Sequence, residues 1–141
     1  MGITGIRTAT SYENGVNAAV FMNELENVIL PTMGVVGEPY SVLVLDNASP
    51  HDKNAIRDLV RANNRIVLFL PPYSYDFNPI ELCFHLGKAM LRKEYHTEDI
   101  NVVLAPQFVD CMYKCCTAEL ACNLFERCHI HVPDEIRAWA M

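Results

Sequence analysis

The sequence predicts an α/β fold with a parallel sheet, and three neighbouring segments carry that prediction. Two continuous apolar runs, Ser41–Leu45 and Arg65–Leu70, have the length of strands and do not alternate with polar residues. Continuous apolar strands are typical of parallel sheets that are covered on both faces. Between them, Lys53–Ala62 carries apolar residues at helical spacing, and Asn63-Asn64 provides a helix stop. A strand, a helix and a strand in this order predict a βαβ unit.

Two further elements are expected on the N-terminal side of this unit. Ile6–Tyr12 alternates loosely and has β-compatible residues, so it is predicted as a strand. Asn17 is suited to cap a helix that runs to about Leu30, where Pro31 is expected to end it.

The C-terminal half is predicted to be helical. Pro79 suits the first turn of a helix that should run to about Tyr95. Thr97 and Thr117 are expected to cap two further helices, the second of which covers about Ala118–Arg127. The last residues show no pattern that places them, so we expect a domain of residues 1–130 and a tail of residues 131–141.

Composition and charge restrict the classes of protein that fit. A chain of 141 residues with 51% hydrophobic and 20% charged residues is expected to be a globular, soluble domain and not a disordered segment. Its longest apolar runs are too short to cross a bilayer, and no secretory signal is visible, which favours an intracellular location. The net charge of −6 has the wrong sign for a protein that grips nucleic acid by itself.

The cysteines allow two interpretations, one structural and one as metal ligands. Cysteine recurs at helical spacing towards the C-terminus, which predicts an apolar stripe of small buried side chains. A metal site is the alternative, since a cysteine and two histidines follow one another closely there. The stripe consists of Cys111, Cys115, Ala118, Cys122 and Phe125, and the alternative metal ligands are Cys128, His129 and His131.

Two acidic residues follow the predicted strands in a way that suggests chemistry. Asp46 comes directly after the first apolar strand, and Glu81 lies in the first turn of the Pro79 helix, with 34 residues between them. Parallel sheets bind their ligands at the carboxyl ends of the strands. Two carboxylates there could bind Mg²⁺ or Mn²⁺, and paired metals support cleavage of a phosphodiester. The alternative is structural, with Asp46 in a turn and Glu81 balancing the helix dipole.

The residues around these acids resemble the mariner-type transposases of the DDE superfamily. Residues 42–51 read VLVLDNASPH, and residues 70–81 read LPPYSYDFNPIE. The family has an apolar strand that ends in Asp-Asn with a His soon after, and then a motif of the form LPPYS…NPIE that opens a helix. The separation of the two acids also fits, and the resemblance covers about residues 5–130.

The resemblance implies an RNase H-like fold and a metal-dependent enzyme that cleaves and transfers DNA strands in the nucleus. Asp46 would then be the second acid of a catalytic triad and Glu81 the third, and both would hold Mg²⁺ or Mn²⁺. Asn47 and His51 would line the site, and Lys88 could approach the DNA backbone.

One departure from the family pattern limits what residues 1–141 are expected to do. The family's first catalytic Asp, which lies on the first strand of its fold, has no counterpart, since the acidic residues before Asp46 are all glutamates. The family's helix-turn-helix DNA-binding region is absent as well. We therefore expect a truncated, partial RNase H-like fold: a βαβαβα core without its first two strands, followed by C-terminal helices, and inactive by itself.

The lack of those two strands would expose an apolar edge at Val42–Leu45, which predicts a homo-oligomer or an aggregation-prone chain. A non-enzymatic relic or co-opted interaction module is the alternative, because it would also explain the missing Asp and the acidic charge. A doubly wound α/β binder would explain the βαβ unit, but the chain has no Gly-rich phosphate loop to support it.

Overall fold

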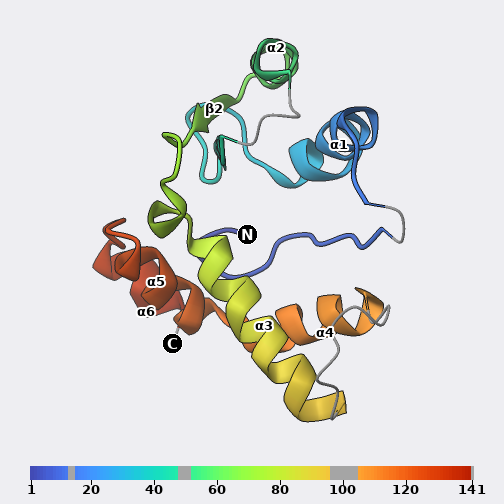
Figure 1. The fold of residues 1–141 in the computed structure, drawn as a ribbon. Coiled ribbons are helices and arrows are strands. Elements are labelled where there is room, and N and C mark those ends of the chain that lie inside the picture. Colours follow the sequence, from blue (N-terminus) through green and yellow to red (C-terminus); the bar gives the residue numbers. More distant parts are fainter. Residues whose placement is uncertain (13–14, 48–51, 96–104, 141) are drawn as a thin grey trace. The chain divides into compact units, whose positions relative to one another are not determined.

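The computed structural model describes residues 1–12, 15–47, 52–95 and 105–140. They form two compact units (Figure 1). The strand unit is Asn14–Ser74, and the helical unit combines Met1–Glu13 with Tyr75–Met141. Each unit has a buried apolar core of its own.

The strand unit contains the predicted βαβ arrangement. Its two strands pair in parallel, with Val42 opposite Ile66 and Leu45 opposite Phe69. The helix between them begins and ends at the predicted residues, so this prediction is confirmed. In chain order the elements are α1 (Ala18–Glu24), a π-helical turn η1 (Leu25–Ile29), a 3-10 turn η2 (Leu30–Thr32), β1 (Val42–Leu45), α2 (Lys53–Ala62) and β2 (Ile66–Phe69).

Side-chain caps start the two helices of this unit. Asn17 accepts a hydrogen bond from the backbone N–H of Val20 at 2.9 Å, which confirms its predicted role. Asp52 accepts from two backbone N–H groups in the first turn of α2, at 3.0 and 3.2 Å. Pro31 does not end the first helical segment as predicted. It lies inside η2, because the first residues of a helical turn do not need their N–H groups.

The prediction that both faces of the sheet are covered is wrong for β1 and β2. Side chains on one face pack against the helices of the strand unit. Those on the other face are exposed by 42–54%. The reason is that α1, its continuation and α2 all contribute to a single core on one face of the sheet. The covered strand residues are Leu43, Leu45, Val67 and Phe69, and the exposed ones are Val42, Val44, Ile66 and Leu68.

The predicted strand at Ile6–Tyr12 is also wrong. These residues form no strand, and within the described residues 1–12 the backbone pairing is an isolated bridge between Gly2 and Gly5. A strand exists only where a neighbour completes its hydrogen-bond ladder. Ile6 packs instead against the core of the helical unit.

The helical unit is built around its longest helix, which occupies the predicted range. Thr117 caps the helix that follows it by accepting from the N–H of Leu120 at 3.2 Å, as predicted. Thr97 lies outside the described residues. The last helix occupies the stretch for which the sequence shows no pattern. The elements are a 3-10 turn η3 (Tyr75–Phe77), α3 (Pro79–Tyr95), α4 (Ala105–Cys115), α5 (Ala118–Arg127) and α6 (Asp134–Ala140).

A glycine allows α3 and α4 to approach closely (Figure 1). A β-carbon at Gly87 would lie 2.6 Å from the Sδ atom of Met112 and 3.1 Å from a ring carbon of Phe108. Any larger side chain at this position would have to displace both residues. Gly87 therefore lies at the contact between α3 and α4.

The described part of the chain contains no helix that is both long and apolar enough to span a membrane.

Candidate functional site

Asp46 lies at the edge of the sheet where both strands end. It follows β1 directly, and its side chain is exposed. The N–H of Leu70, the first residue after β2, donates to the carbonyl oxygen of Leu45 at 2.8 Å. Because this bond joins the two carboxyl ends, the chain that leads towards Glu81 leaves the sheet beside Asp46.

Basic side chains from α2 lie at the same edge, and the sequence analysis missed them. Lys53 donates a hydrogen bond to the side-chain oxygen of Asn47, and its Nζ atom lies 5.7 Å from the centre of the Phe69 ring. Arg57, one turn later, lies 5.0 Å from the same ring centre. Both contacts are cation–π interactions at the carboxyl end of β2. The signal was present, since two basic residues four apart follow the Asp46 strand.

Glu81 occupies the first turn of α3, as predicted. Its backbone N–H donates to the carbonyl oxygen of Asn78 at 3.1 Å. Its side chain is exposed and forms no hydrogen bond or ion pair among the described residues. The carboxylate is therefore available to a ligand from solution.

Two of the three remaining predicted site residues, Asn47 and Lys88, lie in the described part of the chain. Lys88 is exposed on α3, two turns after Glu81, and Asn47 is half-buried beside Lys53. His51 lies outside the described residues. Asp46 belongs to the strand unit and Glu81 to the helical unit, so their sharing of a cation stays a prediction.

The chemistry of the two acids suits a hard divalent cation. Both carboxylates are exposed, so each could supply oxygen ligands while water completes the coordination, as Mg²⁺ prefers. Across the ranges that the structure describes, no three His, Cys, Asp or Glu side chains are grouped so as to hold a metal ion.

The cysteines are core residues, which confirms the prediction that they are small buried side chains. All six are free, and all but Cys115 are buried. The predicted single stripe is wrong in one respect, because the chain breaks at Cys116 and Thr117 and divides it between α4 and α5. Cys128 is buried, whereas His129 and His131 are exposed.

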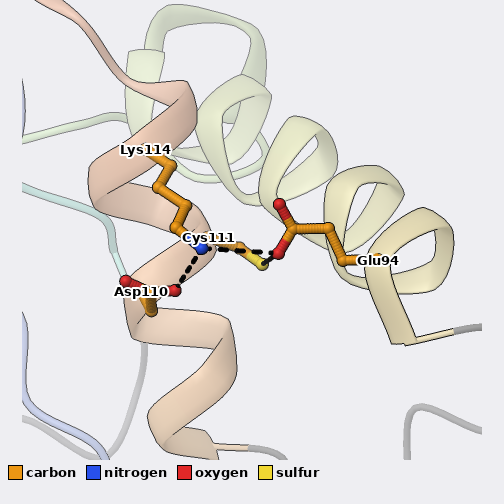
Figure 2. Close-up of polar contacts among 4 residues, drawn as sticks. All are labelled: Glu94, Asp110, Cys111 and Lys114. Atoms are coloured by element: carbon orange, nitrogen blue, oxygen red, sulfur yellow. Dashed lines mark hydrogen bonds and ion pairs between the residues drawn. The ribbon is translucent and has the colours of Figure 1, made fainter.

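Burial makes several of these thiols poor nucleophiles. A hydrogen bond with Cys116 and burial raise the pKa of Cys83. Burial, together with the carboxylate of Glu94, raises the pKa of Cys111. Figure 2 shows the thiol of Cys111 directed at Glu94, with an Sγ–Oε2 distance of 3.7 Å. Because the thiolate is the reactive form, these residues should resist modification.

Comparison with known protein families identifies the family of the chain. A family model described as DDE superfamily endonuclease matches residues 3–103, which include Asp46 and Glu81. The chain belongs to the DDE superfamily of endonucleases. This superfamily uses divalent metals and acts on DNA, and it suggests an RNase H-like fold. Comparisons with curated proteins and with solved structures gave no match.

The protection of the thiols can be measured directly. We expect Ellman's reagent to modify Cys115, the half-buried thiol, first, and the five buried thiols only at the rate of local or global unfolding. Replacing Cys115 with Ser should remove the fast phase, and guanidinium should expose all six thiols. A single fast phase with six equivalents in native buffer would contradict the described cores.

Proposed function

We propose that residues 1–141 are part of the catalytic domain of a mariner-like DDE transposase and carry its second and third acids, Asp46 and Glu81. The observation that carries this proposal is the position of each acid within the matched family region. Asp46 follows β1 at the carboxyl edge of a parallel sheet, and Glu81 opens the helix reached from the neighbouring strand. Ligands of such sheets bind at that edge.

The proposed reaction is metal-dependent DNA strand cleavage and transfer in the nucleus. A bound Mg²⁺ or Mn²⁺ would supply the positive charge that activates a water molecule and then a 3′-hydroxyl. Asp46 and Glu81 would hold it. Asn47, fixed by its bond with Lys53, and His51 would line the site, and Lys88 would contact the DNA backbone.

We infer that residues 1–141 do not cleave DNA by themselves. The resemblance implies that the first acid of the triad is an Asp on the first strand of the fold, and residues 1–45 contain no Asp. This is also why we propose that the chain represents a partial RNase H-like fold, without the first two strands. With two carboxylates, a metal would be held less firmly and positioned less well.

A second candidate function is a non-enzymatic interaction module. The exposed apolar face of the sheet favours it, because Val44 and Leu68 lie side by side there with about half of their surface exposed. Exposed apolar faces and strand edges promote association. We propose that this face joins two copies of the chain.

Metal binding tests the pairing of the acids. We expect Mn²⁺ to bind the chain, and Asp46→Asn or Glu81→Gln to weaken it at least about tenfold, since even indirect changes to a metal site have effects of that size. The double variant should bind Mn²⁺ no more weakly than either single variant does, because both acids bind the same ion. Titration followed by electron paramagnetic resonance measures this.

The matched control is Asp58→Asn, which removes one exposed carboxylate from α2 and should leave Mn²⁺ affinity unchanged. Additive losses from the two acids, or affinities equal to that of the unmodified chain, would show that they do not share a cation.

Catalysis is tested with supercoiled plasmid and Mn²⁺. We expect the chain to show no nicking above the background of the Asp46→Ala/Glu81→Ala double variant, because the first acid of the triad is missing. Agarose gels report the nicked form. Nicking by the unmodified chain that either single variant abolishes would overturn the inference of inactivity while supporting the roles of the two acids.

Self-association is tested by sedimentation velocity over a range of concentrations. The unmodified chain should form dimers or larger species. Val44→Lys combined with Leu68→Glu should shift it to monomer, since it places an ion pair on the apolar face. Tyr113→Lys, at an exposed site on α4, is the control and should have no effect. A monomeric unmodified chain that melts cooperatively would count against association through this face.

A further inference from the structure

We propose that Cys83 and Cys116 form a reversible disulfide bond when hydrogen peroxide reaches the helical unit. The bond would join α3 to the short connection between α4 and α5. Cys83 lies two residues after Glu81, so the bond would fasten the first turns of α3 to the rest of the helical unit. Formation of the bond depends on neither DNA nor a metal ion.

The crossing of α3 and α4 brings the two residues together. Gly87 and Met112 meet at this crossing. Cys83 lies one turn before Gly87, and Cys116 lies one turn after Met112. The N–H of Cys116 donates to the carbonyl oxygen of Met112 at 3.0 Å, which fixes Cys116 at the end of α4. Both cysteines are therefore part of the same buried core.

The two thiols are directed at each other. They share a hydrogen bond, which lowers the pKa of Cys116 and raises the pKa of Cys83. A thiolate on Cys116 is thus stabilised by the thiol proton of Cys83. Because the thiolate is the form that peroxides oxidise, Cys116 is the sulfur that we expect to react first. Cys83 lies beside it and can complete the bond.

Two other cysteines near the pair have different hydrogen-bond acceptors. The thiol of Cys115 donates to the carbonyl oxygen of Met112 at 3.6 Å. The thiol of Cys122 donates to the carbonyl oxygen of Ile3 at 3.4 Å. Cys115 also lies within hydrogen-bond range of Cys83, so it is the alternative partner that an experiment has to distinguish from Cys116.

The reaction consumes one peroxide for each bond. The sulfur of Cys116 attacks an oxygen of hydrogen peroxide, the O–O bond breaks, and a sulfenic acid and a water molecule result. The sulfur of Cys83 then attacks the sulfenic sulfur, and the S–S bond forms as the hydroxyl group leaves. This hydroxyl takes the thiol proton of Cys83 and departs as a second water. Two thiols are oxidised, and the peroxide is reduced to water.

Burial restricts the reaction to small oxidants. The exposed fraction is 0% for Cys83 and 4% for Cys116. Hydrogen peroxide is close to water in size, so small local openings of the core admit it. Ellman's reagent carries aromatic rings and needs a much larger opening. We therefore expect peroxide to oxidise the pair in the folded chain, under conditions in which Ellman's reagent modifies only Cys115 rapidly.

The test is peptide mapping after treatment with limiting hydrogen peroxide. The remaining thiols are blocked, and the chain is digested with trypsin and examined by mass spectrometry. Trypsin releases residues 66–88, whose single cysteine is Cys83, and residues 115–127, which contain Cys116. We expect these two peptides to be linked, with two of the six thiols lost. Dithiothreitol should restore both thiols by exchange.

Single variants and thermal melting assign the bond and its effect. Cys83→Ser and Cys116→Ser should each abolish the link, whereas Cys115→Ser and the matched buried control Cys122→Ser should keep it. Circular dichroism should show that each variant is folded. The oxidised chain should melt about 10 °C above the reduced chain, because the bond restricts the unfolded state. Fragmentation of the linked peptides identifies the bonded sulfur in the unmodified chain as well.

Three results would overturn the proposal. A link that persists in Cys116→Ser and is lost in Cys115→Ser would assign the bond to Cys115. Six unreacted thiols after peroxide treatment, or a disulfide-linked dimer on a non-reducing gel, would show that the pair does not form a bond within one chain. A lower melting temperature for the oxidised chain would show that the bond does not fit the native packing.

Discussion

The candidate site depends first on the parallel pairing of β1 and β2. Parallel pairing brings both carboxyl ends to one edge, and the bond from Leu70 to Leu45 holds them together there. Only a crossover can join parallel strands, and α2 supplies it, started by the Asp52 cap. The same crossover brings Lys53 and Arg57 to the Phe69 ring. One pairing therefore determines where an acid, an amide and two cations lie.

The helical unit has a core of its own, which is built from different residues. Three of the five buried residues of its core, Cys83, Cys116 and Ala121, have small side chains, which allow helices to approach each other. Free thiols suit this role because they are compact and apolar when protonated. A hydrogen bond with Cys116 and burial raise the pKa of Cys83, whereas the same hydrogen bond lowers the pKa of Cys116, so the proton of this pair is held on Cys83.

Sequence reasoning succeeded where the information is local. Asn17 and Thr117 were predictable caps because a cap depends on a few neighbouring residues. Glu81 was predictable in a first turn because Pro79 marks the start of the helix. The place of each acid, after a strand or in the first turn of a helix, was predicted in the same way from the neighbouring residues.

It failed where the answer depends on distant residues. Whether Ile6–Tyr12 becomes a strand depends on a partner strand, which no local pattern reveals. The exposed face of β1 and β2 has the same apolar residues as the covered face, so the sequence could not distinguish them. Lys53 and Arg57 lie near the predicted site only because the crossover brings them to the end of β2. The spatial relation of Asp46 to Glu81 depends on two separate units.

The glycine at the crossing of α3 and α4 has a consequence for the substitutions that the helical unit tolerates. Because Gly87 has no side chain, Met112 and Phe108 of α4 lie directly against the α3 backbone. A β-carbon at this position would overlap the Sδ atom of Met112, so the packing of α4 on α3 would have to shift. Even the small change to alanine at position 87 is therefore expected to disturb the core of the helical unit, whereas a change on the exposed side of α3 is not.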